Sequence, residues 1–452
     1  MDKLSARINY MINCENDDFF VNINIDKNVE QILYDYQLLH LYNLITAFRN
    51  NNVVMDGSDT GTGKTYTSIA LCKQLNLNPI ILCPKIMINE WERICELFGV
   101  VPIYIINYES AKSKVNKFVK NVSVNPKKPE YIWVIPRNSI VIFDEVHRCK
   151  NNNTQNYQLL LAAKKLRYVL MLSATLTDKP NDFKIFGYML GLYNTINKGT
   201  SWIKIKLHED SIKINKNSLS SICLAIYPDK GSRMQISELK DKFPENKVMA
   251  NAYHIGKEHK KVIADYVAKV KEIKNLGTCQ GDDLVMFLRL RQYIENVKVD
   301  IIKDLIFDHL EEGFSIVVFL NYTESINKLA KLCNTKCIVN GETTIEERER
   351  NIAAFQSGQE QLIICNISVE SISLHDVHGI RKRLSLISPN FSSTKLIQAC
   401  GRIYRAGSQS ACLQKIIFCS GTYEEQMCEK IKKKLDFIEK LNSNELMEIE
   451  DF

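Results

Sequence analysis

The chain has 452 residues, of which 45% are hydrophobic and 25% are charged, and its formal net charge is +7. This is the composition of a soluble globular protein that is long enough for two or three domains. No apolar run reaches the length of about 18 residues that a bilayer requires, and the N-terminus lacks the apolar core of a signal peptide. We therefore expect an intracellular protein without a membrane partner.

The cysteines and the net charge limit what the protein can bind. The 14 cysteines are scattered without a C-x-x-C pair, so we expect neither a zinc site nor a disulfide framework. A charge of +7 is modest for this size, and it is compatible with a nucleic-acid partner without requiring one. The sequence leaves the oligomeric state open.

A glycine-rich segment near the N-terminus has the order of strand, loop and helix that a nucleotide phosphate site needs. The segment from Met55 to Thr67 reads M-D-G-S-D-T-G-T-G-K-T-Y-T. Gly61 and Gly63 allow the backbone N–H groups to turn inward. Lys64 can reach the β- and γ-phosphates of ATP, and Thr65 can hold Mg²⁺ at the start of a helix. An ordinary strand-to-helix turn is the alternative.

We predict that the whole loop of this segment binds the nucleotide. The general pattern has a glycine six positions before the lysine, whereas this chain has Ser58 there; a small residue is sufficient at that position. The predicted cofactor-binding residues of the loop are Ser58, Asp59, Thr60, Gly61, Thr62, Gly63, Lys64 and Thr65.

A second half-site begins 80 residues after the lysine. The apolar run Ile140–Phe143 predicts a buried strand, and Asp144 and Glu145 follow at its carboxyl end, where ligands bind in open parallel sheets. Asp144 can hold Mg²⁺, and Glu145 can orient the attacking water, as phosphoryl transfer requires. His147 can couple the acidic pair to the neighbouring strand. The two half-sites together predict ATP hydrolysis.

Two further strands of the first domain end in residues that can respond to a nucleic-acid strand. The strand Ile80–Cys83 ends at a Pro-Lys turn, which places Lys85 where a phosphodiester backbone could lie. The strand Tyr168–Leu172 ends in L-S-A-T-L, whose hydroxyl residues suit a coupling between the ATP pocket and a bound strand. A polar turn without function is the alternative for this motif. Its candidate coupling residues are Ser173, Ala174 and Thr175.

The hydrophobic pattern divides the chain into two α/β units. We assign residues 1–28 to a polar segment, 29–205 to the first unit, 206–298 to a connection with helical insertions, 299–440 to the second unit and 441–452 to an acidic tail. In the second unit, short apolar runs alternate with helical patterns, which predicts a parallel sheet. These runs are Ile316–Phe319, Cys337–Val339, Gln361–Cys365 and Leu384–Ile387.

The second unit also contains the segment K-L-I-Q-A-C-G-R-I-Y-R-A-G-S-Q. Arg402 and Arg405 are three residues apart, so a helix would present them on one face, with Gln398 four residues before Arg402. An arginine that one domain delivers to the γ-phosphate on another makes hydrolysis depend on domain closure. We predict this catalytic role for the two arginines; ordinary surface arginines are the alternative.

In this order, the motifs resemble those of the superfamily 2 helicases, and more narrowly those of the Swi/Snf-like ATPases. The narrower resemblance rests on C-P-K-I-M-I-N-E-W-E-R-I-C-E-L-F, D-E-V-H-R-C-K-N-N-N-T-Q-N-Y, the basic turn before F-P-E-N-K, N-G-E-T-T-I-E-E-R-E-R-N-I-A-A-F and Q-A-C-G-R-I-Y-R-A-G-S-Q. It covers about residues 29–440. The resemblance implies two RecA-like lobes with parallel sheets flanked by helices, ATP and Mg²⁺ between them, and a nucleic-acid strand across both.

The resemblance also implies roles for particular residues. Gln37 lies in the helix that apolar spacing predicts over residues 29–48, where a glutamine of the family hydrogen-bonds the adenine edge; a polar residue on a helix surface is the alternative. By its place in the family motif, the resemblance implies that Arg405 is the arginine finger, the arginine that reaches the γ-phosphate.

Three departures from the family pattern affect this prediction. The chain has S-A-T-L where the chromatin branch has T-G-T-P, which favours helicase relatives. The fifth motif reads S-V-E-S-I-S-L from Ser368 to Leu374, with Ser368, Val369 and Ser371 where glycines are usual. No chromatin-reading or separate DNA-binding domain is left over. The H-D-V-H-G and S-P-N-F-S-S segments are similar to proteins of large DNA viruses.

We therefore predict an ATP-dependent helicase or translocase that uses ATP and Mg²⁺, with DNA favoured over RNA as its partner. Transcription or replication machinery is a candidate partner, and the expected location of a viral protein of this kind is the host cytoplasm, with the virion as a second place. One alternative is a viral transcription-release ATPase that moves without unwinding. The other is an ATP-gated clamp for nucleic acid or protein with little turnover.

Overall fold

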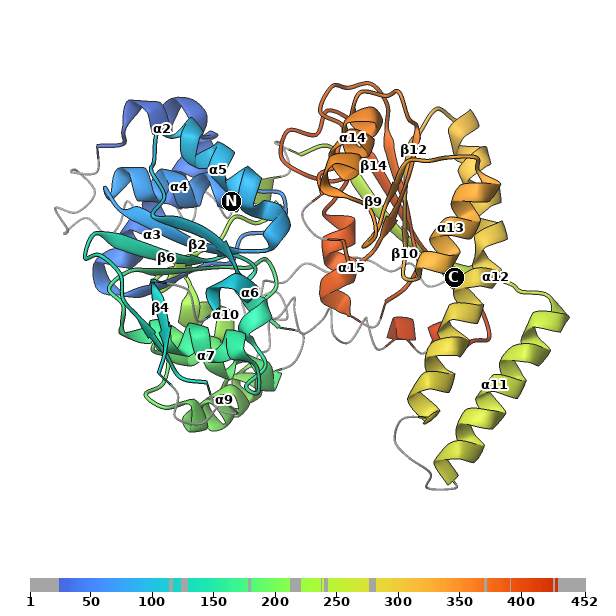
Figure 1. Cartoon of the computed structure of the whole chain (residues 1–452), viewed down its shortest axis with the longest axis horizontal. Coiled ribbons are helices and arrows are strands. Elements are labelled where there is room, and N and C mark those ends of the chain that lie inside the picture. The colour runs from blue at the N-terminus through green and yellow to red at the C-terminus, as the bar shows by residue number, and fades with distance from the viewer. Residues whose placement is uncertain are drawn as a thin grey trace. The chain divides into compact units, whose positions relative to one another are not determined.

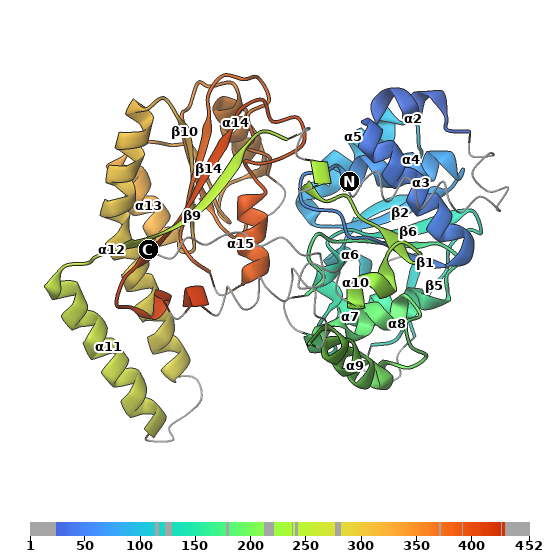
Figure 2. The same cartoon turned by 180° about the vertical axis from the view of Figure 1, so that it is seen from behind.

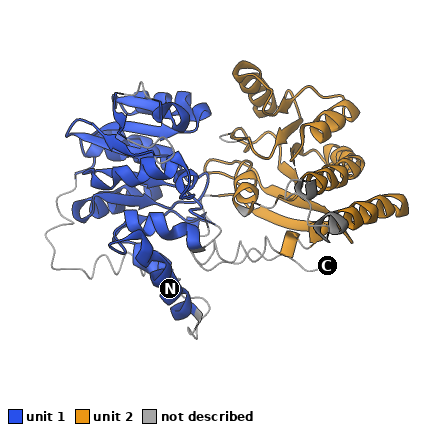
Figure 3. Ribbon diagram, turned by 60° about the horizontal axis from the view of Figure 1, so that its bottom comes forward, with its two compact units in different colours: residues 1–240, 436–446 blue, residues 241–435, 447–452 orange. Residues whose placement is uncertain are grey.

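Two parallel sheets organise the chain, one in each of two units (Figure 3). The computed structural model describes residues 24–113, 117–122, 129–177, 180–211, 221–236, 238–239, 243–275, 282–369, 372–390, 392–425 and 427–429. Unit 1 comprises residues 1–240 and 436–446, and unit 2 comprises residues 241–435 and 447–452. The boundary at residue 240 falls inside the stretch that we interpreted as a connection.

The sheet of unit 1 has the strand order β3-β2-β6-β7-β1-β8, and every pairing in it is parallel. Its strands are β1 (Val53–Asp56), β2 (Asn78–Cys83), β3 (Tyr104–Asn107), β6 (Ser139–Phe143), β7 (Val169–Leu172) and β8 (Gly231–Ser232). Short apolar runs form the central strands, as predicted, because both faces of a parallel sheet are covered. The α/β fold class is thereby confirmed for this unit.

Helices cover both faces of this sheet (Figure 1). One face carries α2 (Lys27–Ile32), α3 (Asp35–Asn50), α4 (Lys64–Gln74) and α5 (Ile88–Leu97). The other carries α7 (Gln155–Ala162), α8 (Lys184–Met189), α9 (Gly199–Ser211) and α10 (Ser221–Ile226). The remaining elements of unit 1 are α6 (Tyr108–Ala111), the antiparallel pair β4 (Val119–Asn121) and β5 (Tyr131–Trp133), and the 3₁₀ turns η1 (Lys85–Met87), η2 (Val146–Cys149), η3 (Ala163–Lys165), η4 (Pro180–Phe183) and η5 (Ile196–Lys198).

The alternation of side chains along each strand produces two separate cores. Val54, Ile81 and Ile142 pack with α3, α4 and α5, whereas Met55 and Phe143 pack in the cluster on the opposite face. A shift of one residue in strand register would exchange the two sets, so the register is strongly specified.

The first helical stretch differs from the prediction of one continuous helix. The chain breaks between α2 and α3, because Leu33 and Tyr34 have extended backbones. The Gln37 side chain accepts a hydrogen bond from the Tyr34 backbone N–H at 3.0 Å and so caps the start of α3. This break fixes Gln37 in the first turn of α3.

The sheet of unit 2 has the order β11-β12-β10-β13-β14-β9, again parallel throughout. Its strands are β9 (Asn246–Tyr253), β10 (Ser315–Leu320), β11 (Ile338–Val339), β12 (Leu362–Asn366), β13 (Arg383–Ile387) and β14 (Cys412–Cys419). The four strands predicted from apolar runs are present, whereas β9 and β14 were not predicted. Figure 2 shows β9 running beside β14 at the edge of this sheet.

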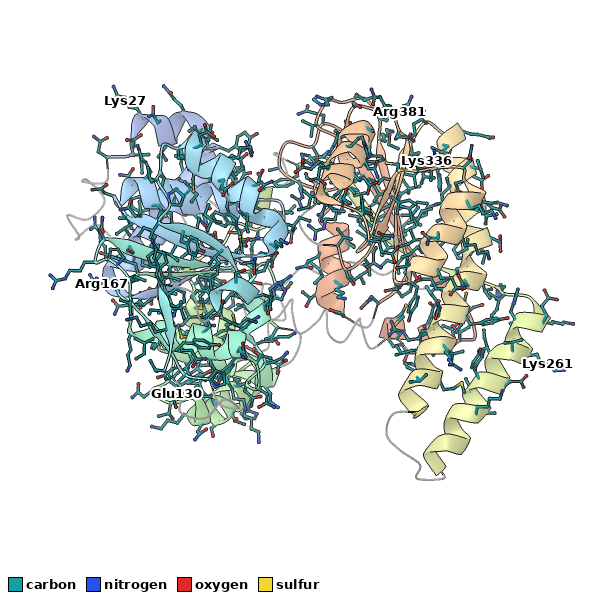
Figure 4. The ribbon with its side chains drawn as sticks, viewed as in Figure 1. Lys27, Glu130, Arg167, Lys261, Lys336 and Arg381 are labelled. Atoms are coloured by element: carbon teal, nitrogen blue, oxygen red, sulfur yellow. The ribbon has the colours of Figure 1, made fainter. Side chains whose placement is uncertain are left out.

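Among the described residues, unit 2 includes the helices α11 (Lys257–Asn275), α12 (Asp282–Glu311), α13 (Thr323–Leu332), α14 (Ile345–Gln356) and α15 (Ser393–Cys400). Residues of α12 and α13 join one core of the sheet, and residues of α14 and α15 join the other. The helical insertion that we predicted is thus the pair α11 and α12. Charged side chains such as Arg167 in unit 1 and Lys261 on α11 project outward (Figure 4).

No helix in the described parts of the chain is both long and apolar enough to cross a bilayer.

A buried ion pair joins α12 to the segment that follows β14. Lys298 and Glu424 are 0% and 2% exposed, and their Nζ and Oε1 atoms are 2.6 Å apart. Lys298 Nζ also donates to Ser388 Oγ at 2.9 Å. Two charges that are removed from water in this way stabilise the fold only as a pair.

We predict that Lys298→Met lowers the free energy of unfolding of unit 2 by about 3 kcal/mol, because Glu424 is left as an unpaired buried charge. The double variant Lys298→Met/Glu424→Gln should recover part of this loss. Lys328→Met is the matched control, since the Lys328–Asp300 pair is exposed and its loss should cost about 0.5 kcal/mol or less. Urea denaturation followed by circular dichroism measures all three, and equal midpoints for Lys298→Met and Lys328→Met would contradict the prediction.

Candidate active site

The predicted phosphate loop connects β1 to the first residue of α4, Lys64. Gly61 and Gly63 have φ values of +87° and +98°, which side chains with a Cβ rarely adopt. A Cβ on Gly63 would also lie 2.1 Å from Gln37 Nε2. The two glycines are therefore required by backbone conformation and by the close approach of α3, and together they shape the cradle that a triphosphate fits.

Polar side chains hold this loop from two sides. Lys64 Nζ donates to the backbone oxygens of Ser58 and Asp59 at 2.8 and 3.1 Å. From the other side, Gln37 is 4% exposed and its Nε2 donates to Thr62 O at 2.9 Å. The structure thus brings Gln37 to the loop. Its amide is bound to the protein at both ends, so its observed role is to position the loop and the start of α3.

The serine that replaces the usual glycine has a structural use. Ser58 is fully buried, its backbone N–H donates to Asp56 Oδ1 at 3.0 Å, and its Oγ accepts from the Met234 N–H at 2.9 Å. A glycine could not make the second contact. Thr60 and Thr65 are both half-buried, and Thr65 lies in the first turn of α4 beside Lys64.

Behind the loop lies a buried carboxylate that sequence reasoning missed. Asp56 is 0% exposed, and its Oδ2 lies 3.0 Å from His40 Nε2. His40 Nδ1 in turn lies 2.9 Å from Ser232 Oγ. Burial acts to raise the pKa of Asp56, but His40, Lys64 and Ser58 outweigh it and hold this pKa below its usual value. A histidine inside an apolar helix pattern was the only signal in the sequence.

The acidic pair follows β6, as predicted. Asp144 is 8% exposed, and its Oδ2 accepts a hydrogen bond from Trp91 Nε1 at 3.0 Å. The Tyr108 hydroxyl donates to the backbone oxygen of Asp144 at 2.7 Å. Glu145 has φ = +52°, a left-handed conformation that is unusual for a residue other than glycine and is concentrated at functional sites.

The environment of Asp144 disfavours its charged form. Burial and the neighbouring Glu145 raise its pKa to about 7, while the hydrogen bond from Trp91 and the charge of Lys64 act in the opposite direction. A divalent cation at this carboxyl would favour the charged form.

The residues present fit ATP with Mg²⁺. The described residues contain no group of three or more His, Cys, Asp or Glu that could hold a metal by itself. Mg²⁺ needs no such cage, because it is usually bound by one or two protein ligands together with substrate phosphates. Thr65 and Asp144 are the residues that would hold it here.

His147 connects the acidic pair to the end of β7. Its Nδ1 lies 3.1 Å from Glu145 Oε2 and 3.2 Å from Ser173 Oγ. Ser173 is 1% exposed and donates from Oγ to the backbone oxygen of Thr175 at 2.8 Å. Ala174 is half-buried between them. The structure therefore places the predicted coupling residues of unit 1 in one connected group.

Lys85 begins the η1 turn directly after β2 and Pro84. Its side chain is exposed at the carboxyl edge of the sheet. This position permits the predicted contact with a phosphodiester backbone.

The arginine motif of unit 2 differs from the predicted helix face. Helix α15 ends at Cys400, so Gln398 lies in its last turn while Arg402 and Arg405 follow it. Both arginines instead turn back to one carbonyl: Arg402 Nη1 and Arg405 Nη2 lie 3.4 and 2.9 Å from Ile372 O. Arg402 is 6% exposed, whereas Arg405 is only half-buried.

The altered fifth motif lies against these arginines. Arg402 Nη2 lies 3.5 Å from Val369 O, and Lys395 Nζ donates to Ser368 Oγ at 2.7 Å. The Ser368 side chain thus engages a lysine of α15 where the family usually has glycine. Ser371 lies outside the described residues.

Comparison with known proteins agrees with both halves of this arrangement. Residues 42–183 match the DEAD/DEAH box helicase family, and residues 297–407 match the helicase conserved C-terminal domain. A putative ATP-dependent RNA helicase of Acanthamoeba polyphaga mimivirus is 32% identical over 94% of this chain and 87% of its own length.

Two further matches carry Swi/Snf names and are more distant. The human SWI/SNF-related matrix-associated actin-dependent regulator of chromatin subfamily A member 1 is 21% identical over 90% of this chain and 43% of its own length. A solved structure of the Sulfolobus solfataricus SWI2/SNF2 ATPase core in complex with dsDNA is 17% identical, covers 90% of this chain and 96% of its own, and superposes with a TM-score of 0.37.

Fold and site define an ATPase built from two RecA-like units, with the phosphate loop and the acidic pair in the first. The chain belongs to the helicase family that the DEAD/DEAH box domain and the helicase conserved C-terminal domain define, and it shares this membership with the mimivirus relative. Its activity is that of an ATP-dependent helicase or translocase.

The contact between Trp91 and Asp144 generates a prediction. Trp91→Phe removes the only N–H of the side chain while it keeps an aromatic ring in the core, so the Asp144 carboxyl loses a partner that orients it. We expect the Mg²⁺ concentration for half-maximal binding of a fluorescent ATP analogue to rise about tenfold, the size typical of partners that orient a metal ligand.

Trp133→Phe is the matched control. Trp133 lies in β5, is also buried, and donates from Nε1 to the backbone oxygen of Leu159 at 3.1 Å. Both variants should have a lower Tm, but only Trp91→Phe should raise the Mg²⁺ concentration that half-maximal binding of the ATP analogue requires. The same shift in both variants would show that Trp91 acts only through stability.

Proposed function

We propose that the protein hydrolyses ATP with Mg²⁺ and couples this reaction to movement along DNA. The observation that carries the proposal is the convergence of the phosphate loop, Asp144-Glu145 and Ser173 at the carboxyl edge of one parallel sheet, with His147 touching both Glu145 and Ser173. Such a contact gives the hydrolytic residues a direct link to a segment that can respond to a bound strand.

The proposed chemistry assigns one task to each residue. Lys64 and the backbone N–H groups of the loop bind the phosphates, and Thr65 and Asp144 hold the cation. Bound Mg²⁺ neutralises charge that develops on the β- and γ-phosphates. Glu145 orients the attacking water, and its contact with His147 holds its carboxylate in place.

We propose that Arg405 supplies the positive charge for the transition state, in preference to Arg402. Arg402 is almost fully buried and contacts the backbone oxygens of Val369 and Ile372. Arg405 is half-buried and is held by Gly401 O and Ile372 O at 3.0 and 2.9 Å. A side chain that is partly exposed can exchange such contacts for a phosphate more readily than a buried one.

DNA is the proposed partner because relatives of this chain are named for chromatin regulation and for DNA repair and recombination. The mimivirus relative is named an RNA helicase, so RNA is the direct competitor. The candidate partner machinery is correspondingly that of viral transcription or replication.

A clamp with little turnover is a second candidate function. It is favoured by the altered fifth motif, where Ser368 replaces a usual glycine and its Oγ accepts a hydrogen bond from Lys395 Nζ. Steady-state turnover separates the two, because a clamp would bind ATP and nucleic acid without stimulated hydrolysis.

We predict that DNA stimulates steady-state ATP hydrolysis more than RNA of equal length. Lys64→Ala should abolish stimulated hydrolysis, and Glu145→Gln should lower kcat at least about 100-fold while ATP still binds, because only water activation is lost. A panel of single- and double-stranded DNA and RNA in a phosphate-release assay tests this. Stronger stimulation by RNA would reverse the choice of partner, and full hydrolysis by Lys64→Ala would refute the site.

We predict that Arg405→Ala lowers kcat about 1,000-fold, the lower end of the effect of an arginine finger, without a matching loss of ATP affinity. Arg405→Lys should recover little, because a lysine lacks the planar fork of the guanidinium. Single-turnover hydrolysis and ATP binding are measured on the same preparations. Turnover by Arg405→Ala within a few-fold of the wild type would exclude the finger.

A further inference from the structure

A short extended segment of unit 1, residues 231–236, runs along the phosphate loop. It begins as β8, which pairs in parallel with the end of β1. Beyond the strand, the backbone pairing continues: the Gly57 N–H donates to Ser232 O at 3.1 Å, and the Asp59 N–H donates to Met234 O at 2.9 Å. We call residues 231–236 the loop strap.

Side chains of the loop and the strap fasten the two segments to each other. Arg233 is 9% exposed, its Nε donates to Gly57 O at 3.0 Å, and its Nη2 donates to Asp59 Oδ1 at 2.7 Å. The other carboxylate oxygen of Asp59 accepts from the Ile236 N–H at 3.0 Å. Both oxygens of this loop residue are therefore engaged by the strap.

Close packing leaves no room for a side chain at two glycines in and beside the strap. A Cβ on Gly231 would be 2.2 Å from Met55 O, and a Cβ on Gly57 would be 1.8 Å from the Tyr227 hydroxyl. His40 bridges Asp56 under the loop to Ser232 in the strap. The strap is thus one wall of the phosphate loop.

The strap also lies close in sequence to the point where the chain passes into unit 2, and only residues 238 and 239 are described between the two. Lys240, four residues after Ile236, ends this part of unit 1, and Asp241 begins unit 2. The strap is therefore near the covalent connection in sequence, and it contacts the phosphate loop through Arg233.

We propose that Arg233 is a positioning residue that holds the phosphate loop through Asp59 and couples nucleotide binding to the connection between the two units. The charged pair fixes the loop backbone from Gly57 to Asp59, and Lys64 in turn is held by the carbonyls of Ser58 and Asp59. Loss of the pair should therefore weaken nucleotide binding more than it changes the hydrolytic step. The proposal rests on ATP binding at this loop and does not depend on which nucleic acid stimulates hydrolysis.

The test is a double-mutant cycle on the full-length chain with Arg233→Met, Asp59→Asn and the double variant. Each single variant should raise the Kd of a fluorescent ATP analogue about tenfold and raise KM alike, with kcat within a few-fold of the wild type. The double variant should be no weaker than either single one, because both break the same contact. Arg137→Met, an exposed arginine of the same unit, is the control and should bind normally.

Hydrogen exchange provides a second readout that a purely structural role would not change. Nucleotide should slow exchange of the strap amides in the wild type, among them the Met234 and Ile236 N–H groups, and this slowing should be absent in Arg233→Met. Asp59→Asn, which keeps the size of the side chain, and Arg233→Lys keep the test valid if Arg233→Met fails to fold.

The outcomes separate this proposal from the site itself. Wild-type nucleotide affinity in correctly folded Asp59→Asn and Arg233→Lys would overturn it, as would strap amides that do not respond to nucleotide. Additive losses in the cycle would also overturn it, because the two residues would then act independently. If Lys64→Ala binds nucleotide normally, the loop is not the ATP site and the underlying function fails instead.

Discussion

Parallel pairing of β1, β7 and β6 is the constraint on which the active site depends. The register aligns Asp56 with Leu172 and Phe143 with Met171, so Gly57, Ser173 and Asp144 all leave the sheet at the same edge. The Ser173 N–H still donates to Asp56 O at 3.2 Å, which ties the phosphate loop to the coupling motif at the point of exit. Candidate site residues from three distant parts of the chain meet because the strand register is fixed by alternate residues that must enter two different cores.

Two buried aspartates at this edge have opposite environments. The surroundings of one favour its charged form, and those of the other disfavour it. Asp56 is compensated by His40 and by the Ser58 N–H, which keep it charged and fix the base of the loop. Asp144 receives the indole N–H of Trp91 but stands next to Glu145, so its charged form is disfavoured. A cation beside the Asp144 carboxyl would favour its charged form. The neighbouring Glu145 has a left-handed backbone conformation.

The sequence predicts the central strands and the motifs at their ends well, because buried parallel strands are continuous apolar runs and glycine-rich loops have characteristic residues. It predicts the strands near the edges of the two sheets poorly. Strand β14 alternates buried and half-buried residues, and β8 is only two residues long, so neither forms an apolar run. The arginine motif was placed on a helix because its spacing fits one, but Gly401 ends α15 first. The partners of Asp56 and Asp59 were missed because a histidine and an arginine far away in sequence have no pattern that relates them to the loop.

The stretch that we interpreted as a connection is in fact shared between the two sheets. It contributes β8 to the edge of one sheet, next to β1, and β9 to the edge of the other, next to β14. The edge strand of each parallel sheet, which would otherwise expose unpaired backbone groups, is thereby covered by the chain that links the units. Because β1 leads directly into the phosphate loop, this arrangement places residues 231–236, which precede unit 2 in the chain, beside that loop. Our proposal therefore assigns the coupling between the connection and the phosphate loop to this backbone pairing and to the buried guanidinium of Arg233.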